Sequence, residues 1–98
     1  PEFIIGELGS GMRVNRAHPN LGPRVTIVDQ RGALIARLGG QNGPGTEAGK
    51  FIAPHGIALD SRGDIYVGEV SYTDWPQTHP DVPIPKGLRS LQKLRKVK

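Results

Sequence analysis

Three side chains in this sequence have the chemistry of a reactive or metal-binding site. His55 stands between Pro54 and Gly56 in the stretch "FIAPHGIALDSRGDIYVGEV", directly before an apolar run. An imidazole in this place could coordinate a metal ion or complete a turn. Glu7 and Glu69 each follow an apolar run and a glycine, and such a carboxylate could orient the imidazole or act as a base. The chain contains no cysteine, which excludes a thiolate metal site, a thiol nucleophile and a disulfide scaffold.

The composition indicates one small domain rich in short strands. The 98 residues include 14 glycines and 9 prolines, and only 36% are hydrophobic, so the core must be thin. No apolar run is long enough to span a membrane. The formal net charge is +4, but six of the 13 Lys and Arg residues fall in the last thirteen positions. We interpret this basic terminus as a solvated edge, so nucleic acid is not the expected partner.

Two stretches of the chain repeat one another. The sequence "EFIIGELGS" at the start aligns with "DIYVGEVSY" at an offset of 62, and the alignment places Glu7 opposite Glu69. Each stretch leads into a loop with a His-Pro pair, beginning at His18 and at His79, and then into a further strand-like run. The chain therefore holds two incomplete copies of one unit.

Turn chemistry places two β-hairpins between these copies. The pattern Asp-x-Arg-Gly occurs at residues 29–32 and again at 60–63, each time between β-rich runs. The aspartate can accept bonds from the following amides, and the glycine can adopt a positive φ, as tight hairpins require. Asp29 and Asp60 are therefore interpreted as turn formers.

The hairpins and the repeat together predict six strands. The last of them is ambiguous, because leucines every three residues leave a basic amphipathic helix open, but the register of the repeat favours a strand. The expected strands lie near residues 3–8, 24–29, 33–38, 56–60, 64–70 and 90–97.

The order of these strands predicts an all-β fold. Numbered within the repeating unit, they read second, third, fourth, then first, second, third. Four-stranded antiparallel units joined in series are the blades of a β-propeller, of which about one and a half are present. The chain opens on "PEFIIGEL", without an initiator methionine, and we interpret it as a piece of a longer polypeptide. The partial propeller of residues 1–98 divides into 2–38 (long loop 9–23), a glycine-rich crossover at 39–54, and 55–98 (long loop 71–88).

The stretch from Arg24 to Val70 resembles the NHL repeat. The likeness rests on "RVTIVDQRGALIARLGG", on a Gly-x-Phe ahead of a Pro-x-Gly-Ile-Ala-x-Asp segment, and on the closing "IYV" followed by an acid. Several glycines, a proline and an aromatic residue fall at the spacing of that family. The resemblance implies a blade of an NHL-type propeller, and the internal copy extends it to residues 2–8.

Within that family, "PHGIALDSRGDIYVGEV" is similar to the blades of the peptidyl-alpha-hydroxyglycine alpha-amidating lyases. Those enzymes are zinc-dependent six-bladed propellers in which Pro-His pairs from several blades supply metal ligands. The resemblance implies that His55 is a zinc ligand and that Glu69, with Glu7 as its counterpart, is the acid ending the second strand. Tyr72 is a candidate for the catalytic tyrosine. The chemistry implied is lyase-like, with zinc polarising a substrate oxygen.

This chain alone does not complete such a site. It holds a single Pro-His pair, and the other two histidines precede proline instead of following it. The up-and-down strand order nevertheless places His55, Glu7 and Glu69 on one rim, together with both long loops. These loops lengthen each repeat to about 62 residues, against roughly 40 to 50 for an ordinary blade. Long loops gathered on one face are commonly functional.

Each candidate also has a structural interpretation. His55 could be a satisfied turn residue. Glu7 and Glu69 could bond loop amides or pair with arginines such as Arg13 or Arg89. The aromatic residues Trp75 and Tyr72 could anchor a loop, and the His-Pro pairs at His18 and His79 could fasten loops.

Three functions from different classes follow. The first is a piece of a zinc-dependent, lyase-like or hydrolase-like propeller enzyme acting on a small-molecule or peptide-like substrate. The second is a non-catalytic propeller module that binds a protein or another ligand. The third is a small stand-alone β protein that forms a homo-oligomer through its exposed strand edges.

Overall fold

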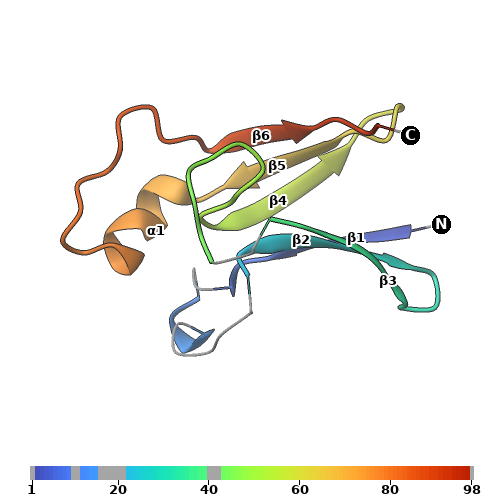
Figure 1. Cartoon of the computed structure of the whole chain (residues 1–98), viewed down its shortest axis with the longest axis horizontal. Coiled ribbons are helices and arrows are strands. Elements are labelled where there is room, and N and C mark those ends of the chain that lie inside the picture. The colour runs from blue at the N-terminus through green and yellow to red at the C-terminus, as the bar shows by residue number, and fades with distance from the viewer. Residues whose placement is uncertain (1, 10–11, 16–21, 40–42, 98) are drawn as a thin grey trace.

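The protein folds into two antiparallel sheets of three strands each (Figure 1). The computed structural model describes residues 2–9, 12–15, 22–39 and 43–97. The first sheet has the order β1-β2-β3 and the second β4-β5-β6, so each is a simple meander. The strands are β1 (Glu2–Glu7), β2 (Arg24–Asp29), β3 (Leu34–Leu38), β4 (Pro54–Leu59), β5 (Ile65–Glu69) and β6 (Leu91–Leu94). Two short helices complete the described chain, the 3-10 helix η2 (Arg13–Asn15) and the α-helix α1 (Ser71–Thr78).

All six expected strands are confirmed, and the fold is mostly β. The helical alternative for the last run is wrong, since β6 forms there. The four-stranded blade is not confirmed, because each sheet has three strands in the described residues. The propeller stays a prediction.

The long loop expected at residues 71–88 begins instead with α1. Its buried residues are Ser71, Asp74 and Trp75, spaced three and four apart, so one face of a short helix turns toward the protein. In the described ranges no helix has the length and apolar character needed to cross a membrane.

Both Asp-x-Arg-Gly segments form the predicted hairpin turns, with the same bonds in each. The Oδ1 atom of Asp29 accepts bonds from the amides of Arg31 and Ala33, at 2.8 and 2.9 Å. In the second turn the corresponding atom of Asp60 accepts from the amides of residues 62 and 64, at 2.9 and 3.1 Å. The glycine of each turn has a positive φ, 86° at Gly32 and 84° at Gly63. The aspartates are therefore engaged in turn geometry.

The main core lies between the two sheets, which face one another. Its fully buried members come from both sheets and from the crossover, and burying each such side chain contributes about 1.5 to 3 kcal/mol. Gly6 of β1 approaches β4 closely, since a Cβ on this glycine would lie 3.0 Å from Cδ1 of Ile57. The core residues are Val25, Phe51, Ile65 and Val67, with Ile4, Ile27, Leu38, Ile57 and Leu94 packed against them.

The two sheets repeat one another in register as well as in sequence. In the first sheet Ile5 pairs with Thr26, and in the second Val67 pairs with Gln92. Because Ile5 and Val67 are 62 positions apart, as are Glu7 and Glu69, the pairing makes Gln92 the counterpart of Thr26. The internal repeat therefore extends from the sequence to the pairing of the strands.

Candidate functional site

The end of the molecule that carries α1 brings the predicted site residues together. Glu7 ends β1, Glu69 ends β5, and His55 lies at the start of β4. The residues that follow the two glutamates, Leu8 and Val70, pack against the same small cluster. This confirms the expectation that all three lie at one end, here called the loop end. The cluster consists of Ile52, Ala53, Trp75 and Leu88.

Glu69 is fully engaged in holding the chain that enters β4. Its Oε1 accepts bonds from the amides of Ile52 and Ala53, at 2.7 and 2.9 Å. Its Oε2 accepts a bond from Nε2 of Gln92, at 3.2 Å. Gln92 in turn bonds the amide of Gly49 and the carbonyl of Lys50, at 3.1 and 2.6 Å. The carboxylate and the amide side chain together tie β5, β6 and the crossover to one another, which supports the structural interpretation of Glu69.

Glu7 is also engaged by side chains of the strand beside it, but its partners differ from those of Glu69. Its Oε2 accepts from Nε of Arg24, at 3.0 Å, and from the hydroxyl of Thr26. Partial burial raises the pKa of this carboxyl. The bonds from Arg24 and Thr26, with the charges of Arg24 and Arg37, outweigh burial and hold the pKa below its usual value of 4.5. A carboxylate with a lowered pKa is a weak general base at neutral pH.

The partners of the two glutamates agree in kind with the structural interpretation. Glu69 bonds amides of the irregular crossover, as one alternative expected, and Glu7 pairs with an arginine, but this arginine is Arg24 and not Arg13 or Arg89. Arg89 donates instead to the carbonyl of Thr46, at 2.7 Å. Both arginines stand close in sequence to the loops, whereas strand pairing brings Arg24 beside Glu7.

His55 is the extra residue of a β-bulge. Pro54 pairs with Glu69 and Gly56 pairs with Gly68, which leaves His55 unmatched between them. The bulge turns its imidazole outward, and the side chain is exposed. Bulges commonly re-aim a side chain next to a site. The structure therefore leaves His55 accessible at the loop end.

The helix and loop after β5 are held by a tryptophan and a histidine. The indole of Trp75 is 6% exposed, and its Nε1 donates to the carbonyl of Val82, at 2.9 Å. The ring of His79 stacks on it with centroids 3.9 Å apart, and Nδ1 lies 2.9 Å from the hydroxyl of Thr78. His79 and Trp75 are thus loop anchors, as their structural interpretation predicted. Tyr72 is 49% exposed on α1, so it is not such an anchor. His18 lies outside the described residues.

A small polar cavity adjoins Glu69. Its volume is about 220 Å³, and it is lined by Glu69, Gln92 and the cations Lys50, Lys86 and Arg89. Among the described residues no three His, Cys, Asp or Glu side chains form a group that could hold a metal ion. Zinc binding by His55 and catalytic roles for Glu69 and Tyr72 therefore stay predictions, and a zinc site would need ligands from outside the described residues.

Comparison with protein-family models, curated proteins and solved structures found no match. The likeness to NHL repeats and to amidating lyases rests on motif spacing alone.

Sequence reasoning missed the residues that complete each glutamate contact. Arg24, Thr26 and Gln92 stand 17 to 23 positions from their partners. The repeat itself could have identified Gln92, if the pairing of the strands had been counted from the aligned residues Glu7 and Glu69. The bulge at His55 depends on cross-strand register and has no sequence signal.

Proposed function

We propose that this chain is a repeat module of propeller type that works by stacking sheets and binding partners, not as a self-contained enzyme. The first sheet of one copy stacks on the second sheet of another copy, repeating the contact inside the chain. The observation that carries the proposal is a difference in burial between equivalent faces of the two sheets. One face of the repeat is buried in the second sheet, and the same face is exposed in the first.

The exposed face of the first sheet is the counterpart of a buried one. In the second sheet Ile65 and Val67 point toward the first sheet and are 6% and 0% exposed. Their counterparts at an offset of 62 are Phe3 and Ile5, which are 57% and 44% exposed. Exposed apolar side chains at positions that pack in a sister sheet mark an interaction surface.

The outer face of the second sheet is the complementary surface. Ile4, Gly6 and Val25 form the packing face of the first sheet. Through the repeat, their counterparts are Tyr66, Gly68 and Leu91, which share the outer face of the second sheet. Leu91 is 64% exposed there. The two surfaces differ, so stacking is heterologous and runs head to tail.

The state of the glutamates supports a binding module over an enzyme. Glu69 has both carboxylate oxygens engaged in bonds to the chain, and Glu7 has a lowered pKa. Neither is a poised base. The loop end remains a surface with exposed apolar residues on α1 and on the segment that follows it, namely Tyr72, Val82 and Ile84.

Sedimentation velocity of the chain over a range of concentrations tests this proposal. We expect a mass above that of one chain that rises with concentration. Ile5→Lys should weaken the association at least about tenfold, since a charge would replace an apolar contact. Tyr72→Lys is the matched control, because it adds the same charge at an equally exposed apolar site on α1.

Two results would contradict the proposal. One is a folded monomer at concentrations up to about 1 mM, which leaves no meaningful association. The other is association that Ile5→Lys leaves unchanged, which would point instead to pairing through strand edges.

A further inference from the structure

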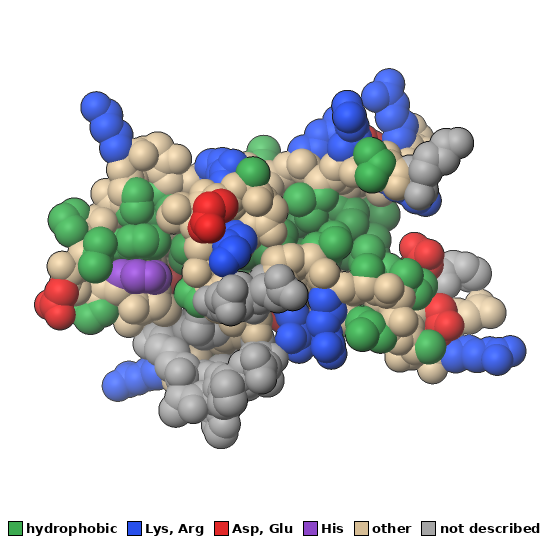
Figure 2. Space-filling view, in the orientation of Figure 1, with side chains coloured by type: hydrophobic (Ala, Val, Ile, Leu, Met, Phe, Trp, Pro, Cys, Tyr) green, Lys and Arg blue, Asp and Glu red, His purple; other side chains and the backbone are tan. Residues whose placement is uncertain are grey.

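A cleft between the two sheets runs along β6. Its volume is about 1000 Å³, and its lining comes from the start of β1, the end of β3, the crossover, the β4–β5 turn and the segment 89–97. In Figure 2 apolar side chains are visible in the hollow between two arms of the molecule. Its apolar walls come from both sheets and include Ile4, Ile27, Leu38, Ile65 and Leu94.

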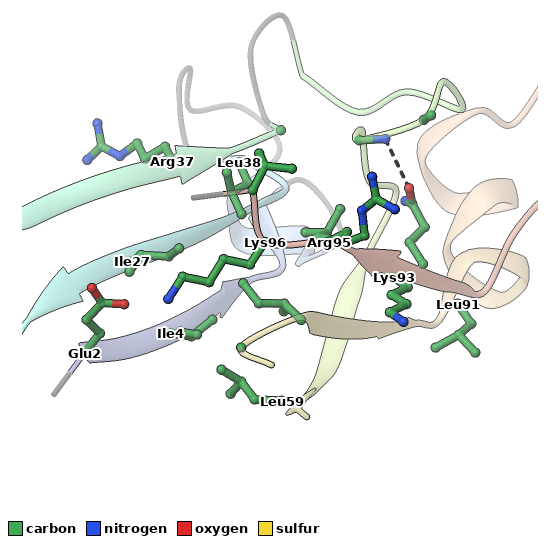
Figure 3. A pocket seen from close by; sticks show the side chains of 18 of the residues that line it. Glu2, Ile4, Ile27, Arg37, Leu38, Leu59, Leu91, Lys93, Arg95 and Lys96 are labelled. Carbon is green, nitrogen blue, oxygen red and sulfur yellow. Dashed lines mark hydrogen bonds between the residues drawn. The ribbon is translucent and has the colours of Figure 1, made fainter. Parts of the chain in front are cut away.

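The rim of this cleft is basic. Arg37, Arg95 and Lys96 belong to its lining, and the acidic residue among the described lining residues is Glu2. Figure 3 shows the side chain of Lys96 reaching into the cleft toward the first sheet. A cleft with cations at its mouth and apolar walls favours a ligand that carries negative charge and apolar groups together.

One wall of the cleft is an open strand edge. The amide of Glu69 donates to the carbonyl of Ser90, at 2.7 Å, and the amide of Lys96 donates to Asp64, at 2.8 Å. Even-numbered residues of this run therefore direct their backbone toward β5, and Leu91 and Lys93 direct theirs away from it.

No strand of the described residues pairs with that outward side of β6. In the first sheet the corresponding side of β2 is covered by β3, where Thr26 pairs with Arg37. In the first sheet the place beside β2 is therefore occupied by a strand. The equivalent place beside β6 holds no strand in the described chain.

We propose that this edge and the cleft together bind an extended acidic peptide, which adds to the second sheet as a strand antiparallel to β6. The backbone groups of Leu91 and Lys93 supply hydrogen bonds. Alternate side chains of the peptide enter the apolar cleft, and the carboxylates between them lie on the outer face beside Lys93. Lys96 adds positive charge at the mouth of the cleft. Strand addition takes its affinity from backbone bonds and its selectivity from pockets for alternate side chains. This edge differs from the stacking face of Phe3 and Ile5, but Leu91 also belongs to the outer face of the second sheet on which that face stacks, so Ile5→Lys is needed to separate the two contacts.

Fluorescence anisotropy with a labelled heptapeptide of alternating Glu and Val tests the proposal. The chain should bind it, and raised salt should weaken the binding, since exposed charges are screened. Leu91→Pro removes one outward amide without touching the pairing with β5, and it should weaken binding about tenfold or more. Lys96→Glu should act similarly through the rim. Circular dichroism checks that each variant is folded.

The controls separate this surface from others. Arg13→Glu makes the same charge change at the loop end and should leave binding unchanged, as should Ile5→Lys, which disturbs only stacking. Equal binding of a Lys and Val heptapeptide would overturn the proposal. Full binding of the acidic peptide to folded Leu91→Pro and Lys96→Glu would also overturn it. A third contrary result is a protein that binds dodecanoate but does not bind the acidic peptide.

Discussion

At the scale of single residues, the carboxylates of Asp29, Asp60, Glu7 and Glu69 hold turns and strands together. Asp29 and Asp60 close two turns with the same pair of amide bonds. Partial burial raises the pKa of Asp60, but bonds from the amides of Arg62 and Asp64 and from the hydroxyl of Tyr66 outweigh it, and the pKa is lowered. The donors that the turn supplies therefore favour the charged form of Asp60.

Glu69→Ala should destabilise the protein by about 2 to 6 kcal/mol, since two buried amides lose their acceptor. The change leaves the amides of Ile52 and Ala53 without an acceptor, and both residues are buried. An unsatisfied buried group costs about 1 to 3 kcal/mol. Urea denaturation measures the effect, with Glu47→Ala, at an exposed position of the crossover, as the control. Unchanged stability would mean that Glu69 is free for another role.

At the scale of elements, short-range chemistry could be predicted and long-range pairing could not. The turn pattern Asp-x-Arg-Gly located both hairpins and therefore four of the strands, because each turn depends on four adjacent residues. No pattern in the sequence predicted α1, since Pro76 interrupts it and its buried face of Ser71, Asp74 and Trp75 depends on packing. The bulge at His55 was equally hidden, because it exists only in relation to β5.

The segment from α1 to β6 should depend on one tryptophan. Trp75→Ala removes the stack on His79 and the bond to Val82, at a cost of about 3 to 5 kcal/mol. We expect faster hydrogen exchange at the amides of Asp74 and His79, with protection kept in β2. Tyr72→Ala, at an exposed site on the same helix, should change stability by less than about 0.5 kcal/mol. Equal exchange in both variants would refute this anchoring role.

At the scale of the whole molecule, the two sheets are copies of one unit set face to face. The sequence predicted the copies and the common end for Glu7, Glu69 and His55. It could not show that each sheet has two different faces, because the side of a strand that is buried is decided by pairing register. We propose head-to-tail stacking because the two faces of each sheet differ. We propose strand addition because one side of β6 is open.

The most direct test of this arrangement joins the two faces chemically. The repeat makes Ile5 the counterpart of Val67 and Leu91 the counterpart of Val25, and Val67 and Val25 belong to one buried cluster. Because the chain has no cysteine, the pair Ile5→Cys and Leu91→Cys supplies the only thiols. Oxidation of this double variant should produce a ladder of disulfide-linked copies on a denaturing gel. Their yield should be well above the yield from the control double variant Tyr72→Cys with Leu91→Cys. Equal yields from the two pairs would contradict head-to-tail stacking.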